Sequence, residues 1–180
     1  DVSWQAARDA YSIHRRDAYQ GNLEPGAFKD GGEYIEVPDA ARYQRRFAAF
    51  ADLYLQVRGE PYPLEAEQQA TLHHMPAQKL LVLGLNSAWR LDHHFRDRAD
   101  IHQVALGQAL RLVRQTEVYA ECVKLAVWHH PIHSGSEDRI KDSGFIERLA
   151  QAGFRLALHG HIHKAEAGQF LYDRSPAGRR

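Results

Sequence analysis

The chain has 180 residues, enough for one domain of ordinary size, since domains most often contain roughly 100–150 residues. Apolar residues make up 44% of the sequence and charged residues 26%, a globular composition that excludes a disordered or fibrous chain. The 23 Lys and Arg residues balance 23 Asp and Glu residues, and this zero formal net charge rules out a strong electrostatic case for general binding to nucleic acid or to an anionic membrane.

The single cysteine, Cys122, cannot form an internal disulfide, which indicates a reducing, cytoplasmic environment. No apolar run reaches the ~18 residues of a membrane span, and the first ten residues have no signal-peptide pattern. Histidine is the unusual component, with 12 residues in the chain.

Two helical patterns are expected before residue 67, separated by a stretch rich in Gly and Pro. The first begins at an N-cap, Ser3, and extends to His14, and the second covers 41–57 after a cap at Asp39. The intervening residues 21–38 predict a surface loop or lid.

The second helical pattern has two distinct faces. Its aromatic stripe is expected in the core, and a neighbouring arginine cluster is expected on a solvated face. The stripe contains Tyr43, Phe47, Phe50, Tyr54 and Val57, and the cluster contains Arg42, Arg45 and Arg46.

From Thr71 onward, short apolar runs alternate with helical patterns, which predicts an α/β fold with an at least partly parallel sheet. The expected elements are a strand hairpin of 71–75 and 79–86, a helix over 101–115, a strand over 123–128, a helix over 144–152, a strand over 155–159 and a last short strand over 169–172.

Polar residues follow three of these strands. Asn86 and Ser87 follow the first, His129 and His130 the second, and a histidine-rich run from residue 159 to 163 the third. Ligands of open α/β sheets bind beyond the carboxyl ends of the strands, so we expect these side chains to meet at one edge.

The segment Gly160-His161-Ile162-His163 predicts a metal site together with His129. In an extended segment His161 and His163 point to the same side, and Gly160 would let the backbone turn sharply or approach a neighbour closely. Neutral imidazoles bind zinc, manganese and iron ions. Each histidine alone would be an ordinary loop or core residue; their grouping at strand ends favours metal binding.

The pairing of His129-His130-Pro131 with Gly160-His161-Ile162-His163 resembles the calcineurin-like metallophosphoesterases. Members of this family carry, in order, D-x-H, G-D, G-N-H-[D/E], a later His and G-H-x-H. The opening Asp1-Val2-Ser3-Trp4 resembles the continuation of the G-N-H-D motif. The resemblance implies a layered α/β/β/α sandwich, incomplete at its N-terminal side, as a single partial domain over 1–180 with a helical and loop insertion at about 8–67.

The implied function is metal-dependent hydrolysis of phosphomonoesters or phosphodiesters at a dinuclear centre of Mn, Fe or Zn ions, acting on a small-molecule or phosphorylated substrate. The resemblance implies that His129 and His161 bind one ion and His163 the other. It implies that Asp1 orients a catalytic His that these residues lack. His130 would contact the substrate or brace its loop.

The chain departs from the family pattern because the D-x-H, bridging Asp and G-N-H motifs are absent. We therefore expect it to be part of a longer phosphoesterase and to be weakly active or inactive by itself. Asp92-His93-His94 spells D-x-H, but it follows 86–89 rather than an N-terminal first strand, so we interpret it as a chance match. Residues 135–138, a short polar run, are expected to form a mobile loop beside the site.

Two other functions fit the same residues. One is a mononuclear zinc hydrolase or lyase with His129, His161 and His163 on one ion. The other is a binding or regulatory module that has the fold but no turnover.

Overall fold

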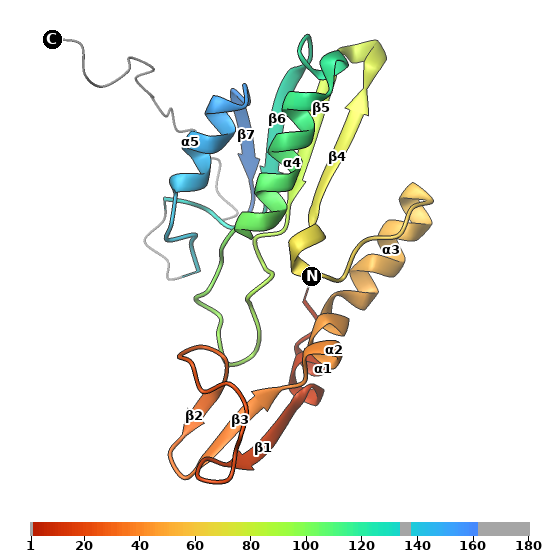
Figure 1. Ribbon diagram of the computed structural model, residues 1–180. Coiled ribbons are helices and arrows are strands. Elements are labelled where there is room, and N and C mark those ends of the chain that lie inside the picture. Colours follow the sequence, from red (N-terminus) through yellow and green to blue (C-terminus); the bar gives the residue numbers. More distant parts are fainter. Residues whose placement is uncertain (1, 134–137, 162–180) are drawn as a thin grey trace, which may run out of the picture.

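The computed structural model describes residues 2–133 and 138–161, and within them the chain forms two sheets with helices beside them (Figure 1). The mixed α/β character expected from the sequence is therefore confirmed. The last expected strand, 169–172, lies outside the described residues. None of the described helices is long and apolar enough to cross a membrane.

The larger sheet has four strands in the order β4-β5-β6-β7. Its strands are β4 (Ala70–Met75), β5 (Leu80–Leu85), β6 (Val123–Trp128) and β7 (Leu156–His159). β4 and β5 form the expected antiparallel hairpin through a 3-10 turn, η3 (Pro76–Gln78), whereas β5, β6 and β7 are parallel. The carboxyl ends of these three strands consequently share one edge of the sheet.

Two crossover helices, α4 (Gln103–Gln115) and α5 (Gly144–Gln151), connect the parallel strands, as expected. Alternate residues of β5 are buried, and the buried residues of α4 recur at helical spacing, so each element presents an apolar face to the other. The buried residues of α4 are Ala105, Leu106, Ala109, Leu110 and Val113. A short 3-10 helix, η4 (Glu117–Tyr119), follows α4.

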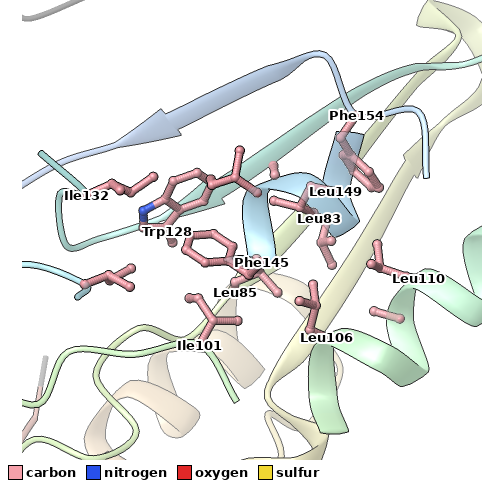
Figure 2. Close-up of a cluster of buried hydrophobic side chains, with 14 of the residues drawn as sticks. Leu83, Leu85, Ile101, Leu106, Leu110, Trp128, Ile132, Phe145, Leu149 and Phe154 are labelled. Atoms are coloured by element: carbon pink, nitrogen blue, oxygen red, sulfur yellow. The ribbon is translucent and has the colours of Figure 1, made fainter. Parts of the chain in front are cut away.

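The centre of this core is an aromatic pair from β6 and α5 (Figure 2). The rings of Trp128 and Phe145 meet edge to face with centroids 5.2 Å apart. Phe145 is 1% exposed. This contact fixes α5 against the strand that leads to His129 and His130.

The N-terminal region differs from the sequence-based expectation. The first helix, α1 (Trp4–Asp9), is capped by Ser3 as expected but ends before His14. Residues 11–15 instead form a strand, and the expected loop of 21–38 contains two more. Together they make an antiparallel sheet in the order β1-β3-β2, with β1 (Tyr11–Arg15), β2 (Lys29–Gly31) and β3 (Tyr34–Pro38).

The reason for this difference is that turn residues are confined to the first part of the expected loop and to the β2–β3 turn. Gly32 in that turn has φ 87°, a conformation that favours glycine. The following β3 contains Tyr34, Ile35 and Val37, residues that favour strands, and Ile35 is completely buried.

The second helical pattern divides into α2 (Ala40–Gln44), a 3-10 turn η1 (Arg45–Phe47) and α3 (Ala48–Arg58). The expected cap is confirmed, because the Asp39 carboxylate accepts a hydrogen bond from the backbone N–H of Arg42 at 2.9 Å. Another 3-10 turn, η2 (Ala66–Gln68), leads into β4.

The expected solvated arginine face is wrong for Arg46, which is 3% exposed. Its guanidinium donates hydrogen bonds to the carbonyls of Tyr43, Leu91 and Trp89, so acceptors distant in the sequence compensate for its burial. The aromatic stripe is only partly in the core. Phe47 is buried, whereas Val57 is 73% exposed.

Replacing Phe145 with Ala should lower the free energy of unfolding by about 3–5 kcal/mol, because it leaves a cavity beside Trp128. Urea denaturation would measure this loss. Val118→Ala is the control, since Val118 is 62% exposed, and its effect should stay within about 0.5 kcal/mol. Equal effects of the two substitutions would contradict this position of the core.

Candidate metal centre

The polar residues that follow the three parallel strands meet at one edge of the larger sheet, as expected. Ser87 lies two residues beyond β5, His129 and His130 directly follow β6, and His161 lies two residues beyond β7. In Figure 1, β7 runs toward the end of the larger sheet that is nearer the small sheet.

The rings of His129 and His161 are close together, with centroids 5.1 Å apart. Nδ1 of His161 lies 3.1 Å from Nε2 of His129. The proximity predicted from the sequence is thus confirmed. With His130, these residues offer three ligand nitrogens within 4.8 Å of one another.

Ser87 holds the two histidines that follow β6. Its Oγ accepts hydrogen bonds from the backbone N–H groups of His129, at 3.2 Å, and His130, at 3.1 Å. The same oxygen lies 2.8 Å from Nδ1 of His130. Both Ser87 and His130 are buried, with 2% and 4% of their surfaces exposed.

These contacts determine which nitrogen of His130 carries the proton. A hydroxyl oxygen has two lone pairs, and here both receive backbone N–H groups. The hydroxyl proton of Ser87 must therefore be donated to Nδ1 of His130, which leaves the ring proton on Nε2. Burial, reinforced by His129 and then His161, lowers the pKa of His130 to about 4, so this ring is neutral near pH 7. His130 is consequently a hydrogen-bond donor at Nε2 rather than a metal ligand there.

The backbone after β7 becomes left-handed at His161, one residue beyond Gly160. Gly160 does not have a positive φ, and its N–H donates to the carbonyl of His129 at 3.0 Å, which extends the strand pairing. A Cβ on Gly160 would meet Nδ1 of His129 at 3.5 Å, an ordinary contact. His161 is the residue with left-handed backbone, at φ 75°. Gly160 therefore has no left-handed backbone, and its N–H pairs with the neighbouring segment.

Asp138 is a residue to which the sequence analysis assigned no role as a ligand or in catalysis. Its Oδ2 lies 3.6 Å from Nε2 of His161. The sequence analysis placed it in a polar loop beside the site, and in the folded chain its carboxylate lies next to His161. Its position seven residues after Pro131, in a run of small and acidic residues, was the available signal.

Asn86, which also follows β5, has a bracing role. Its Oδ1 accepts from the backbone N–H of Ala88 at 2.7 Å, and its Nδ2 donates to Oε1 of Gln69 at 2.6 Å. These bonds hold the turn that presents Ser87.

The donor set is compatible with a transition metal ion. Nitrogen ligands bound at about 2.0–2.1 Å around a common ion lie roughly 3–3.5 Å from each other, and the facing nitrogens of His129 and His161 have this spacing. The expected ligand His163, the expected orienting residue Asp1 and residues 135–137 of the expected mobile loop lie outside the described residues.

Comparisons with protein-family models, with curated proteins and with solved structures gave no match for this chain.

Replacing Ser87 with Ala should lower the free energy of unfolding by about 1–3 kcal/mol, because two buried N–H groups and Nδ1 of His130 lose their partner. Ser12→Ala is the control. Its hydroxyl is exposed and makes only a 3.5 Å contact with the carbonyl of Val37, so we expect a change within about 0.5 kcal/mol. Similar urea denaturation midpoints for the two variants would contradict the bracing role of Ser87.

Nitrogen NMR of the isotope-labelled, metal-free protein near neutral pH should find His130 in the Nε2–H tautomer. In Ser87→Ala this preference should weaken, because the hydroxyl donor to Nδ1 is gone. An Nδ1–H tautomer in the unsubstituted protein would mean that His130 can offer Nε2 to a metal ion.

Proposed function

We propose that this chain carries part of the active site of a metal-dependent phosphoesterase with a layered α/β/β/α fold and a dinuclear Mn, Fe or Zn centre. The main support is the pair of imidazole nitrogens from His129 and His161, 3.1 Å apart at the ends of neighbouring parallel strands. The H-H-P and G-H-x-H motifs that carry these residues resemble those of calcineurin-like metallophosphoesterases.

His129 and His161 provide ring nitrogens for one ion, and His163 would serve the other. His130 has a different role, because its Nε2–H can donate a hydrogen bond to a phosphoryl oxygen of the substrate. Its burial and its link to Ser87 keep that donor neutral and fixed in direction. Asp1 would orient a catalytic histidine that these 180 residues do not contain.

Bound ions in such a centre lower the pKa of a water molecule and neutralise phosphoryl charge. Among the described residues, this cluster supplies little negative charge in return. Its imidazoles carry no negative charge, and the single carboxylate of Asp138 cannot offset the four positive charges of two divalent ions. A general acid that protonates a leaving group contributes about 10²–10⁴-fold in rate, and the histidine expected to assist in this way is not in the sequence.

We therefore expect this cluster to bind one transition metal ion weakly, and the purified chain to hydrolyse model phosphoesters poorly. Titration with Mn²⁺ or Zn²⁺ by calorimetry should give one site at this cluster, and His161→Ala should abolish it. His161→Gly should also abolish binding. Glycine adopts the left-handed backbone of this position without strain, so this variant removes the ligand without straining the backbone.

His159→Ala is the matched control, because His159 is the last residue of β7 but is not among the clustered ligands. The His159→Ala variant should bind the ion with unchanged affinity.

A longer protein that contains the upstream motifs should hydrolyse p-nitrophenyl phosphate or its diester with added Mn²⁺ and lose that activity with His161→Ala. Rapid chelator-sensitive turnover by the 180-residue chain would contradict the expected need for further ligands.

A further inference from the structure

A second group of possible metal ligands lies between the small sheet and the segment that follows β5. Glu36 comes from β3, and His93 and His94 come from the segment before α4. Their ligand atoms all lie within 4.8 Å of one another. None of these residues belongs to the cluster of His129, His130 and His161.

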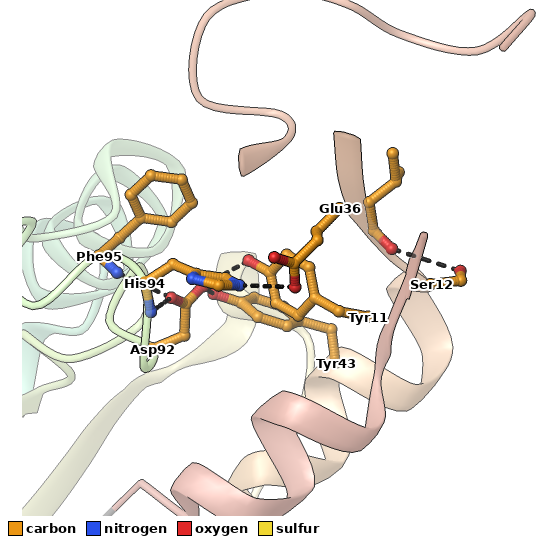
Figure 3. Close-up of polar contacts among 8 residues, drawn as sticks. Tyr11, Ser12, Glu36, Tyr43, Asp92, His94 and Phe95 are labelled. Carbon is orange, nitrogen blue, oxygen red and sulfur yellow. Dashed lines mark hydrogen bonds and ion pairs between the residues drawn. The ribbon is translucent and has the colours of Figure 1, made fainter. Parts of the chain in front are cut away.

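One pair of these ligand atoms already has the spacing of two ligands of a common ion. Nε2 of His94 and Oε2 of Glu36 are 3.0 Å apart (Figure 3). Ligands held at about 2.0–2.2 Å around one ion lie roughly 3–3.5 Å from each other. Two imidazoles and one carboxylate are donors that suit Zn²⁺ and Fe²⁺.

His93 completes the group. Its ring lies close to that of His94, with centroids 3.9 Å apart and planes tilted by 41°. The ring of Tyr11 contacts both histidines edge to face. Nδ1 of His93 is buried and has no hydrogen-bond partner among the described residues.

Asp92 fixes the backbone that carries both histidines. Its completely buried carboxylate accepts hydrogen bonds from the hydroxyls of Tyr11, at 2.7 Å, and Tyr43, at 2.5 Å. It also accepts from the backbone N–H groups of His94, at 2.7 Å, and Phe95, at 2.9 Å (Figure 3). The ligand positions are therefore held by a network of partners, as ligands of metal sites commonly are.

We propose that Glu36, His93 and His94 form a mononuclear site for a divalent transition metal ion, which joins β3 to the segment before α4. With three protein ligands, the ion has a position left for water. The carboxylates of Glu36 and the nearby Asp92 supply negative charge that the His129 cluster largely lacks. The site connects the small sheet to the larger one, so binding should stabilise their association.

The test uses a His129→Ala/His161→Ala double variant, in which the first cluster has lost its ligands. Calorimetric titration with Zn²⁺ should give one ion per chain, and Co²⁺ should give the visible absorption of a bound ion. Zn²⁺ should also raise the thermal unfolding temperature. Adding Glu36→Gln should weaken Zn²⁺ binding at least about tenfold and remove most of the thermal shift.

Glu33→Gln is the matched control, because Glu33 is an exposed residue of the same β2–β3 hairpin and is not in the cluster. It should leave Zn²⁺ affinity and the thermal shift unchanged. Absence of Zn²⁺ binding in the double variant, or unchanged affinity with Glu36→Gln, would overturn the proposal.

Because Glu36→Gln also removes the contact with His94, circular dichroism must first establish that the variant folds. If it does not fold, X-ray absorption of the Zn²⁺-loaded double variant decides the question. Two imidazole ligands with a carboxylate or water oxygen would support the site. A shell with one or no imidazole would overturn it.

Discussion

The arrangement of the candidate centre depends on one hydroxyl group, that of Ser87. By accepting both backbone N–H groups that follow β6, its oxygen ties the end of β5 to the loop that carries His129 and His130. Its proton then determines the tautomer of His130. With this loop fixed, the carbonyl of His129 receives the N–H of Gly160, which carries the strand pairing across to the segment of His161. One buried serine thus aligns residues from three strands.

The sequence predicted the part of the fold in which each helix or strand has a regular spacing of apolar residues. The parallel strands, α4 and α5 have this spacing. Because parallel strands bring their carboxyl ends to one edge of the sheet, the proximity of His129 and His161 could also be predicted. The region before residue 67 depends instead on long-range partners. β1 forms because it pairs with β3. Arg46 can be buried because carbonyl groups more than forty residues away accept hydrogen bonds from its guanidinium. The contact between Asp138 and His161 likewise joins two separate segments of the chain. No local pattern contains these contacts.

The two histidine clusters differ in how they are supported. His129 and His161 extend from strand ends, are partly exposed and have little negative charge around them. His93 and His94 are held between two sheets by a buried carboxylate, two tyrosine hydroxyls and a glutamate. The His-His pair after β6 therefore presents one exposed and one buried ring at the edge of a sheet, whereas the pair after Asp92 contacts the small sheet. Their surroundings, rather than the residues themselves, define what each can do.

The left-handed backbone of His161 limits which amino acids can replace it. At φ 75° the chain accepts glycine most easily, and Asn, Asp and His are the side chains that enter this region most readily. Binding an ion at this position requires an imidazole, carboxylate or thiolate donor. Only His and Asp satisfy both conditions well, and Asp would change the local charge. Backbone conformation and metal chemistry therefore both restrict this position. Most substitutions of His161 would either strain the left-handed backbone or remove the metal-binding side chain.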